Sequence, residues 1–568
     1  MKWKEKYEEW QASPNVSLKL KNSMKNLDEQ ALHDSFYKYL EFGTGGMRGK
    51  VGAGINRMNH LMVRRLTMSL ALYLKENAEP NKKGIVIQYD TRWYSKEFSE
   101  ETAAVLASQG IPVFLSDQAR PTPLLSYLVR EMNAAGGVMI TASHNPPEYN
   151  GYKIYNSVGG QLVPKEVEGI VTILNDLPSE TELEPIDFLH YVKNKKITYY
   201  GEEMEQKYID SLKESFPIIT TEQEKKTDLK IVYTPLHGTG RSLLLKTLAQ
   251  FDFHNVAVVA EQATFDGAFP TVKLPNPEEK EAFYLSIEEA KKKNADIIFA
   301  TDPDADRLGV AIKSDEKDYQ LITGNQLGAV LIHYLLINAS DVSNKVIIKT
   351  IVTSDFGALI ARSHNCIVKE TLTGFKYIGE LIEQMKEDAT CQFLFGYEES
   401  YGYLIDPIVR DKDAIQAALL TAQAAHFYKK QGKTLMEVLE ELYRKYGYFN
   451  DSLQTVTFYG KEERENIQRK INELRAKPPL QIAGEKIVRL EDYESGRWID
   501  FLNNKSGLLT LPESDVMKFI LEDGSWFAIR LSGTEEKCKI YFSAIGENDE
   551  KSKQLLSDME KQILDNYF

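Results

Sequence analysis

Residues 84–117, GIVIQYDTRWYSKEFSEETAAVLASQGIPVFLSD, hold two apolar runs separated by a charged segment of helical composition. The runs at 84–90 and 111–117 are typical of buried strands, and residues 95–110 predict a helix that ends at Gly110. The same order recurs from LKIVYTPL (229–236) and again from KVIIKTIV (345–352). Three strand-helix-strand units predict three α/β domains of similar topology.

The two ends of the chain differ from this pattern. The first 40 residues are typical of an amphipathic helix with a turn near Asp34 and Ser35, and the last 120 residues predict antiparallel strands closed by a helix. Charged, weakly periodic segments near 176–205 and 445–455 resemble boundaries. We therefore expect four domains, at residues 1–200, 201–318, 319–442 and 443–568.

Composition excludes several classes of protein. The 568 residues carry a net charge of −14, which argues against general nucleic-acid binding, but a locally positive pocket still allows a small anionic substrate. The three cysteines, Cys366, Cys391 and Cys538, form no C-x-x-C pair, which favours a reducing cytoplasm without disulfides or a zinc site. The charged N-terminus does not resemble a secretory signal, and no run approaches 18 apolar residues. We expect a cytoplasmic protein that binds neither nucleic acid nor a membrane.

An acidic turn, DPDADR, lies between two strand-like runs. Asp302, Asp304 and Asp306 alternate along it, and three carboxylates at this spacing can converge on one hard cation. An EF-hand is excluded, because Arg307 and Lys313 stand where that loop needs glycine and glutamate. A solvated acidic hairpin is the competing interpretation, but the repulsion among three like charges favours a metal.

Ser143 follows the apolar run GGVMI, inside ITASHNPPEYNGYKIY (140–155). Pro146 and Pro147 exclude a helix after it and no glycine flanks it, so the G-x-S-x-G elbow of the hydrolases is not present. A serine of this kind can carry a phosphoryl group, whose oxygens would complete the shell of a metal. The alternative is a simple turn that caps the strand.

Two further turns carry side chains that suit a sugar phosphate. LFGYEESYGYL places Glu398, Glu399 and Ser400 between two glycines, where carboxylates can bind sugar hydroxyls, although a solvated turn is the default interpretation. AIRLSGTEEKCKIYF near the C-terminus places Arg530 beside small and hydroxyl-bearing residues. An arginine fork with backbone N–H groups can bind a phosphate, and a plain hairpin turn is the alternative.

These four turns, in this order, resemble the α-D-phosphohexomutase family over nearly the whole chain. TASHNPPEYNGYK is similar to its phosphoserine loop, DPDADR to its magnesium loop, GYEES to its sugar loop and RLSGTEEK to its phosphate loop. Further similar segments are FGTGGMRG, YDTRWYS, RPTPLLSY, TPLHGTGR, FPTVKLPNPE, TLTGFKYIG and VRDKD. The length and the helical N-terminal extension are most like the long bacterial phosphoglucomutases, which are related to the phosphopentomutase branch.

The resemblance implies a fold and an activity. The implied architecture is four domains around a central cleft: three similar mixed-sheet α/β domains and a C-terminal α+β domain like the TATA-binding protein. The implied enzyme is an intramolecular phosphotransferase of the isomerase class, which interconverts α-D-glucose 1-phosphate and glucose 6-phosphate through a phosphoserine and glucose 1,6-bisphosphate. Phosphopentomutase and phosphomannomutase activities are alternatives, and a non-catalytic sugar-phosphate-binding protein is a remote one. We expect a monomer or a weak homo-oligomer whose partners are small sugar phosphates.

Site residues are carried over position by position. The implied catalytic residues are Ser143, His144, Lys153 and Arg307. The implied ligands of one Mg²⁺ are the phosphorylated Ser143 with Asp302, Asp304 and Asp306. The implied substrate-binding residues are Arg48, Lys376, Glu398, Ser400, Arg530, Ser532, Gly533 and Thr534.

Two positions depart from the family pattern. Tyr403 stands where many bacterial relatives have a histidine, which makes Lys412 a rival of Lys153 as the general acid or base. Glu536 stands where proline is common, and this adds a negative charge beside the implied phosphate loop. Lys537 and Lys539 can offset that charge.

Overall fold

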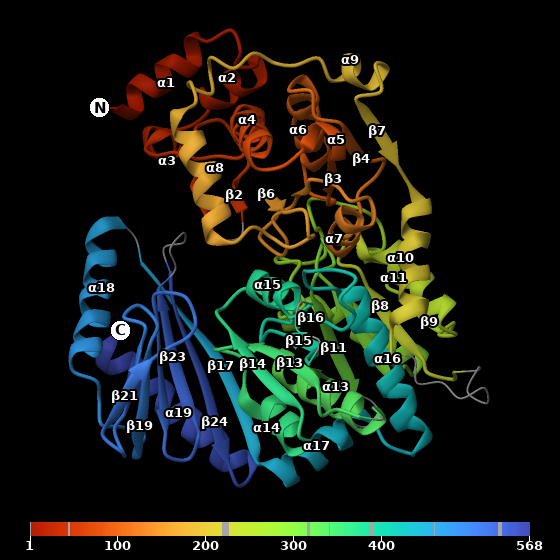
Figure 1. The fold of residues 1–568 in the computed structure, drawn as a ribbon, viewed down its shortest axis with the longest axis vertical. Helices are drawn as coiled ribbons and strands as arrows, with labels where there is room; N and C mark the ends of the chain where they lie inside the picture. Colours follow the sequence, from red (N-terminus) through yellow and green to blue (C-terminus); the bar gives the residue numbers. More distant parts are fainter. Residues whose placement is uncertain are drawn as a thin grey trace. The chain divides into compact units, whose positions relative to one another are not determined.

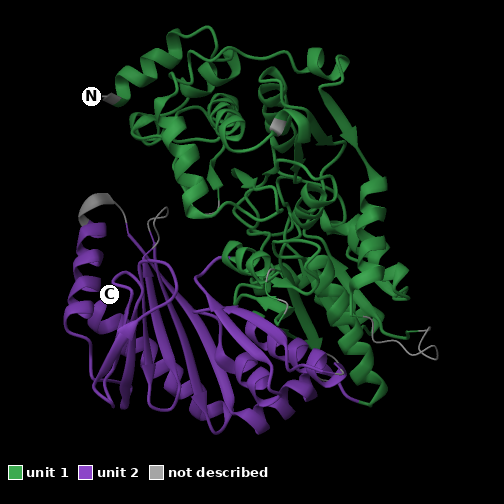
Figure 2. Ribbon diagram, viewed as in Figure 1, with its two compact units in different colours: residues 1–324, 375–432 green, residues 325–374, 433–568 purple. Residues whose placement is uncertain are grey.

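The computed structural model describes residues 2–43, 46–217, 227–314, 318–339, 341–386, 388, 390–458, 460–531 and 537–568. The chain forms two compact units, each assembled from two stretches of sequence. The first unit holds Met1–Gly324 and Phe375–Gly432, and the second holds Asn325–Gly374 and Lys433–Phe568 (Figure 2). Residues of the expected 319–442 domain belong to both units.

Segment 84–117 forms β3, α6 and β4 in the first unit. β3 (Ile85–Tyr89) is buried at every position, as expected for a strand covered on both faces. It pairs in parallel with β4 (Val113–Ser116) and with β5 (Gly136–Ile140). Figure 1 shows α6 (Ser95–Ser108) and α7 (Thr122–Glu131) on opposite faces of this sheet. The strand-helix-strand prediction is confirmed here.

The first sheet has seven strands, in the order β1-β2-β6-β5-β3-β4-β7. Its other strands are β1 (Phe42–Gly43), β2 (Gly46–Lys50), β6 (Tyr149–Tyr155) and β7 (Ile197–Tyr200). The other helices of this region are α4 (His60–Asn77), α5 (Pro80–Lys83), α8 (Pro164–Asp176), α9 (Phe188–Lys193) and α10 (Glu202–Ser215). β6 runs antiparallel to β5, so residues 141–148 turn at the carboxyl end of β5. Ligands of open α/β sheets bind at this edge.

Three helices replace the single helix expected over the first 40 residues. They are α1 (Lys2–Ala12), α2 (Leu18–Met24) and α3 (Glu29–Phe36). The side chain of Ser17 caps α2 and that of Asp28 caps α3, because an oxygen that accepts from a free backbone N–H begins a new helix. Asp34 and Ser35, near which a turn is expected, lie in the last turn of α3, which ends at Phe36 just before a bend at 37–38.

The second sheet of the first unit has five strands, in the order β12-β11-β10-β8-β9. They are β8 (Ile231–Thr234), β9 (Val256–Val258), β10 (Ile297–Thr301), β11 (Leu308–Lys313) and β12 (Tyr319–Ile322). The helices of this region are α11 (Gly240–Gln250), η2 (Ala260–Gln262), η3 (Lys280–Phe283) and α12 (Tyr284–Lys293). β10 pairs in parallel with β8 and antiparallel with β11, which places the acidic turn at the carboxyl end of β10.

The remaining part of the first unit carries the third polar turn. Its elements are α15 (Phe375–Met385), β15 (Gln392–Tyr397), β16 (Tyr403–Leu404) and α16 (Ala414–Lys430). β15 and β16 are antiparallel, and residues 398–402 join them. The side chain of Asp413 caps α16, which packs against α11.

The second unit combines a parallel strand pair with an antiparallel sheet. β13 (Lys345–Thr350) and β14 (Ile367–Thr371) are parallel, and the helices near them are α13 (Gly324–Asn338), α14 (Asp355–Ser363) and α17 (Leu435–Tyr446). The C-terminal sheet has the order β17-β24-β23-β22-β19-β20-β21, with β18 paired to β19. Its strands are β17 (Tyr448–Thr457), β18 (Gln481–Ile482), β19 (Glu485–Asp492), β20 (Arg497–Asp500), β21 (Lys505–Leu508), β22 (Val516–Leu521), β23 (Trp526–Leu531) and β24 (Lys537–Gly546). With α18 (Gly460–Ala476) and α19 (Asp549–Tyr567), it confirms the expected strands closed by a helix.

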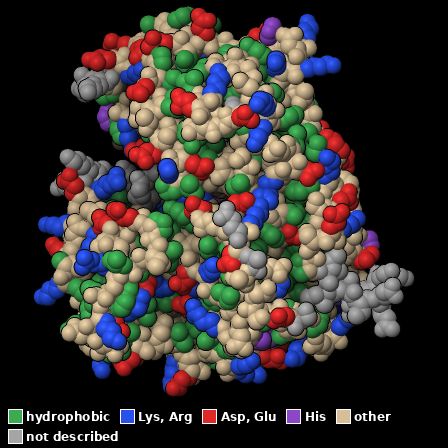
Figure 3. Space-filling model, in the orientation of Figure 1, with side chains coloured by type: hydrophobic (Ala, Val, Ile, Leu, Met, Phe, Trp, Pro, Cys, Tyr) green, Lys and Arg blue, Asp and Glu red, His purple; other side chains and the backbone are tan. Residues whose placement is uncertain are grey.

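The surface carries charges of both signs. On the face drawn in Figure 3, Lys and Arg side chains are interspersed with Asp and Glu side chains. Within the part of the chain that the structure describes, no helix has both the length and the apolar composition needed to cross a membrane.

Candidate active site

The acidic turn between β10 and β11 brings three carboxylates together. Asp302, Asp304 and Asp306 are at most 1% exposed, and one ligand atom of each lies within 4.8 Å of the others. Oδ1 of Asp302 accepts hydrogen bonds from the backbone N–H groups of Asp306 (3.1 Å) and Arg307 (3.0 Å), which closes the turn from inside. This buried trio is not the solvated acidic hairpin of the competing interpretation.

The protein neutralises the trio incompletely. Burial and repulsion from Asp304 and Asp306 raise the pKa of Asp302 well above its usual value. Burial opposes the ionisation of Asp306 as well, but Lys412 and Lys153 outweigh it and lower the pKa of that carboxyl. The Oδ1 atoms of Asp304 and Asp306 are buried and have no hydrogen-bond partner among the described residues. Such oxygens fit a hard divalent cation, which prefers oxygen ligands.

Ser143 leaves β5 in a left-handed conformation with a φ of +51°, which costs a residue other than glycine about 1–3 kcal/mol. Hydrogen bonds hold it there. Thr141 Oγ1 accepts from the N–H of Ser143 at 2.8 Å. The guanidinium of Arg92, which is 3% exposed, donates to the carbonyls of Ser143 (2.6 Å), Asn145 and Pro146 (2.8 Å). A buried guanidinium that binds three carbonyls of one loop fixes the shape of that loop.

The serine hydroxyl meets the acidic turn from 159 residues away in the sequence. Ser143 Oγ donates to Oδ2 of Asp302 at 2.7 Å, and Nδ1 of His144 lies 3.1 Å from the same Oγ. Burial and the neighbouring Arg307 and Arg48 hold the pKa of His144 well below its usual value. The imidazole is therefore neutral at neutral pH, and its Nδ1 can hydrogen-bond the serine.

Two buried lysines reach the same carboxylates. Nζ of Lys153, on β6, lies 2.8 Å from Oδ2 of Asp304 and 3.2 Å from Oδ2 of Asp306. Nζ of Lys412 lies 3.1 Å from Oδ2 of Asp306 and 3.1 Å from Oδ1 of Asp411. Burial lowers the pKa of each lysine, but the carboxylates outweigh burial and leave both values raised. Both side chains are therefore ammonium ions, and both are placed to handle a proton.

The turn 398–402 lies beside the acidic turn. Arg307 forms a backbone bridge with Gly402, and Lys412 packs against the same glycine, because a Cβ added there would meet the Lys412 side chain. Glu398 is 6% exposed, and burial raises its pKa to about 7 although Lys412 opposes the shift. Ser400, on the same turn, is half-buried.

Arg48 and Lys376 belong to the same unit. Arg48, on β2, donates from Nη1 to Oδ1 of Asn145 at 3.3 Å, and its Nε is buried without a hydrogen-bond partner in the described part of the chain. Lys376, in the first turn of α15, is 6% exposed, and its Nζ lies 5.0 Å from the ring centroid of Tyr377. Arg48 thus contacts the serine loop directly, through Asn145.

The implied phosphate loop lies mostly outside the described residues. Arg530 is half-buried on β23, opposite Val516 of β22 and Lys539 of β24. Ser532, Gly533, Thr534 and Glu536 fall in the range 532–536, which the structure does not describe. Phosphate binding by this loop stays a prediction.

Three residues to which the sequence assigned no role support the site. Arg92 shapes the serine loop. Thr122, the first residue of α7, donates from Oγ1 to Oδ2 of Asp304 at 2.8 Å, and its N–H donates to the carbonyl of Asp304 at 2.8 Å. Oδ1 of Asp411 accepts from both the N–H and the Nζ of Lys412. The sequence signal that could have identified these residues is their position in the segments YDTRWYS, RPTPLLSY and VRDKD.

Comparisons with known proteins agree with this geometry. Models of the phosphoglucomutase/phosphomannomutase family match alpha/beta/alpha domain I at residues 39–180, domain II at 206–315 and domain III at 323–446. A phosphoglucomutase of Staphylococcus saprophyticus is 39% identical over 557 residues, which is 98% of this chain and 99% of that protein.

Two solved structures show the same fold. A phosphoglucomutase (parafusin) from Paramecium, in an open form, has a TM-score of 0.67 at 18% identity and covers 93% of this chain and 95% of its own. An N-acetylphosphoglucosamine mutase from Aspergillus fumigatus, in complex with GlcNAc-6P and magnesium, has a TM-score of 0.51 at 14% identity. The match covers 98% of this chain and 100% of that one. With the near full-length match at 39% identity, these findings show that the chain belongs to the phosphoglucomutase/phosphomannomutase family, the α-D-phosphohexomutases, and is an enzyme of the isomerase type.

Proposed function

We propose that this enzyme interconverts α-D-glucose 1-phosphate and glucose 6-phosphate. The observation that carries the proposal is the 2.7 Å hydrogen bond from Ser143 Oγ to Asp302, inside a trio of buried aspartates. A hydroxyl held beside a divalent-cation site is placed to carry a phosphoryl group. Curated relatives that match over most of the chain are phosphoglucomutases, which supports glucose phosphates as the substrates.

Asp302, Asp304 and Asp306 would hold Mg²⁺, together with an oxygen of the phosphorylated Ser143. Bound there, Mg²⁺ supplies positive charge to the oxygens of the transferring phosphoryl group. The orphaned Oδ1 atoms of Asp304 and Asp306 support this assignment, as does the magnesium in the complex of the Aspergillus fumigatus relative.

The first chemical step moves the phosphoryl group from Ser143 Oγ to a free hydroxyl oxygen of the sugar. The bond from phosphorus to Oγ breaks, the bond from phosphorus to the sugar oxygen forms, and one proton passes the opposite way. Because the pKa values of Lys153 and Lys412 are raised, both lysines are protonated at the start of this step. Either one can therefore act as the acid that protonates Oγ. His144 and Arg307 are proposed to flank the phosphoryl group.

A second transfer completes the isomerisation. The first step leaves glucose 1,6-bisphosphate and a free serine, so the bisphosphate must reorient before its other phosphate returns to Ser143. This scheme needs a separate holder for the phosphate that is not being transferred. We assign that role to Arg530, Ser532, Gly533 and Thr534, and contacts with the rest of the substrate to Arg48, Lys376, Glu398 and Ser400.

The wider setting of the enzyme follows the same proposal. We assign four domains, at 1–200, 201–318, 319–442 and 443–568, a cytoplasmic location, and a monomeric or weakly self-associating state. Sedimentation velocity at several protein concentrations measures the state of self-association.

A coupled assay tests the choice of sugar. Glucose 1-phosphate, mannose 1-phosphate and ribose 1-phosphate are compared with Mg²⁺ and a trace of the matching bisphosphate. We expect kcat/KM to be largest for glucose 1-phosphate by at least about tenfold, because a site built to bind sugar hydroxyls rejects substrates that leave its polar groups unpaired. Faster turnover of ribose 1-phosphate would show a phosphopentomutase instead.

The variant Ser143→Ala tests the phosphoserine. It is expected to abolish turnover of every substrate and to remove one phosphoryl group from the intact mass of the purified protein. Ser23→Ala, which changes an exposed serine of α2, is the matched control and should retain both activity and mass pattern. Substantial turnover by Ser143→Ala would refute the phosphoryl-carrier role.

A further inference from the structure

Asp411 joins two distant segments of the first unit to Lys412. It is 1% exposed, and both of its carboxylate oxygens accept hydrogen bonds. Oδ2 accepts from the hydroxyl of Tyr155 and from Nε2 of Gln161, each at 2.7 Å. Oδ1 accepts from the N–H (2.8 Å) and the Nζ (3.1 Å) of Lys412. A buried carboxylate with these partners has a fixed orientation, so it presents a fixed negative charge to Lys412.

Tyr155 and Gln161 come from the end of β6 and from the segment that follows it. Tyr155 is 1% exposed, and burial, together with the charge of Asp411, raises the pKa of its phenol well above the usual value. The phenol therefore keeps its proton and donates a hydrogen bond to Asp411. Gln161 is half-buried and forms a backbone bridge with Tyr155, which places the two donors side by side.

The Lys412 side chain is held along its length as well as at its end. A Cβ added at Gly402 would lie 2.3 Å from Cδ of Lys412, so the methylene groups pass directly over this glycine. Nζ of Lys412 lies 5.7 Å from the ring centroid of Phe375 and 3.1 Å from Oδ2 of Asp306. These contacts leave the ammonium group little freedom to move away from the acidic turn.

Lys153 is not anchored in this way. Its Nζ forms ion pairs with Asp304 and Asp306, two of the implied metal ligands, and with no other carboxylate of the described residues. A divalent cation at those oxygens competes with Lys153 for them. Lys412 shares Asp306 but also contacts Asp411, which is not one of the three clustered aspartates. The position of Lys412 therefore depends less on the metal site than that of Lys153 does.

We propose that Tyr155 and Gln161 are positioning residues, which fix Asp411 and through it hold the ammonium group of Lys412 at the acidic turn. The inference rests on the proposed role of Lys412 in proton transfer, which requires the proton donor to stay within hydrogen-bond reach of the reacting oxygen. Tyr155 contributes more than Gln161, because Gln161 lines a cavity of about 360 Å³, where water can replace its amide.

The variant Tyr155→Phe tests the proposal with the whole protein. We expect kcat to fall by about tenfold, because a displaced proton donor slows the transfer step. KM should stay within about twofold of the wild-type value, since Tyr155 contacts none of the candidate substrate-binding residues. Gln161→Leu should lower kcat by less than Tyr155→Phe does. Steady-state kinetics on the sugar 1-phosphate that the wild type turns over fastest measure both constants.

Tyr208→Phe is the matched control for a lost phenol–carboxylate hydrogen bond. Tyr208 is 0% exposed and donates to Asp413, which lies two residues after Asp411 but caps α16 and does not contact Lys412. This variant should retain the wild-type kcat. An equal loss of kcat in Tyr155→Phe and Tyr208→Phe would overturn the proposal, because it would show general damage to this loop.

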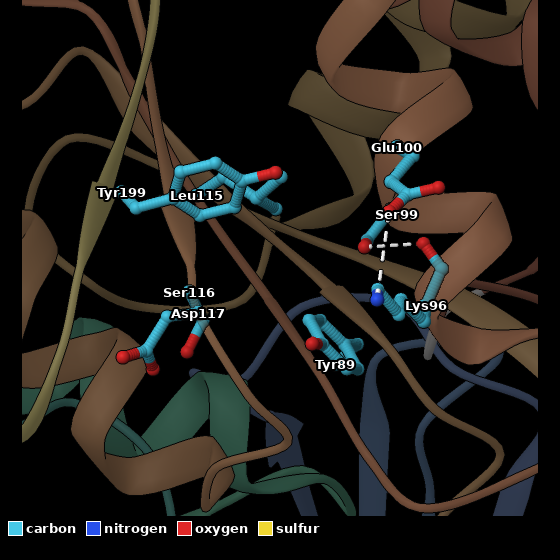
Figure 4. Close-up of a pocket in the computed structure, with 8 residues that line it drawn as sticks. All are labelled: Tyr89, Lys96, Ser99, Glu100, Leu115, Ser116, Asp117 and Tyr199. Atoms are coloured by element: carbon cyan, nitrogen blue, oxygen red, sulfur yellow. Dashed lines mark hydrogen bonds and ion pairs between the residues drawn. The ribbon is translucent and has the colours of Figure 1, made fainter. Parts of the chain in front are cut away.

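Tyr89→Phe is a second control, in the same sheet as Tyr155. Figure 4 shows Tyr89 at the wall of a separate cavity of about 250 Å³, which none of the candidate active-site residues lines. Loss of this phenol should leave kcat unchanged. A tenfold loss of kcat here would also overturn the proposal, because the effect of Tyr155→Phe would then not be specific to Asp411.

A double-mutant cycle shows whether Tyr155 acts through Lys412. Tyr155→Phe should lower kcat by less than about twofold further in a Lys412→Met background, because a positioning residue has no effect once the group it positions is gone. A further tenfold loss in that background would overturn the proposal, as would a wild-type kcat in Tyr155→Phe. A wild-type kcat in Lys412→Met would instead refute the role of Lys412 in the proposed function.

Discussion

Each unit of this enzyme buries a cluster of charged side chains, and the two clusters differ in how completely they are paired. In the second unit, Nζ of Lys349 lies 3.2 Å from Asp355 and 2.8 Å from Glu370. Lys518 lies 4.0 Å from Asp355 and donates to the carbonyl of Ile351 at 2.8 Å. The carboxylates of Asp355 and Glu370 are 31% and 37% exposed, so water can complete their hydrogen bonds.

The cluster of the first unit is drier and less complete. Asp302, Asp304 and Asp306 are at most 1% exposed, and Oδ1 of both Asp304 and Asp306 has no hydrogen-bond partner among the described residues. In a cluster with a structural role, the carboxylates are satisfied by the cations of the protein and by water. The candidate active site instead keeps buried carboxylate oxygens without hydrogen-bond partners, at a cost in folding stability that a bound cation would offset.

Replacing one buried lysine in each cluster separates the two roles most strongly. Lys153→Met is expected to lower kcat by about 10²–10⁴-fold, because it removes a proposed proton-transfer group. Lys349→Met is the matched control, because the side chain of Lys349 is 0% exposed and that of Lys153 is 1% exposed. This variant should retain the kcat of the folded protein. Coupled assays at saturating glucose 1-phosphate measure both. Equal loss of kcat in the two variants would erase the distinction.

The same Lys349→Met variant should show its effect in stability. It leaves Asp355 and Glu370 without their nearest cation, and we expect the free energy of unfolding to fall by about 3 kcal/mol, at the low end for a broken buried pair because both carboxylates are partly exposed. Guanidinium denaturation followed by tryptophan fluorescence measures this free energy. Trp526 reports on the cluster, because its ring centroid lies 4.3 Å from Nζ of Lys518. Lys369→Met, at a half-buried neighbour on β14, should change stability by less than about 0.5 kcal/mol.

Mg²⁺ should stabilise the incomplete cluster and not the paired one. At one hundred times its dissociation constant, Mg²⁺ is expected to add about 2.7 kcal/mol to the stability of the region that binds it. Differential scanning calorimetry with and without chelator measures the shift. Asp304→Asn should remove most of it, whereas Asp355→Asn should leave it intact. A shift that is lost in Asp355→Asn would mean that Mg²⁺ binds elsewhere.

A smaller, pH-dependent effect is expected at Asp451 on β17. Burial raises its pKa to about 6, and Asn325 donates to its Oδ2 at 3.0 Å. The folded carboxyl holds its proton more tightly than the unfolded one, whose pKa is about 3.9. Stability therefore falls as pH rises between these two values, and the loss persists above the higher one.

Asp451→Asn removes this ionisation. The variant should be more stable than the wild type by about 1–2 kcal/mol near neutral pH, with a difference that shrinks towards about pH 4. Thermal unfolding across that pH range measures the difference. A difference that stays constant with pH would assign the effect to packing instead.

Local patterns predicted the elements around the site correctly. The apolar run at 84–90 became β3, and the acidic turn DPDADR lies between β10 and β11 as its flanking runs indicated. The prediction failed in the first 40 residues, where the caps at Ser17 and Asp28 divide a helical pattern into short helices. Helical periodicity alone does not show such interruptions, because a cap depends on which backbone N–H a side chain reaches.

By itself, the sequence determined that three carboxylates share one turn and that Ser143 stands on a non-helical loop after a strand, because both depend on neighbours in the chain. The resemblance to a family indicated that these turns form one site. Only the tertiary structure decided that Ser143 Oγ lies 2.7 Å from Asp302, that Lys153 and Lys412 both contact Asp306, and that Arg92 holds the serine loop. Each of these contacts joins segments far apart in the chain, so its length is set by how the elements pack and not by any local pattern of residues.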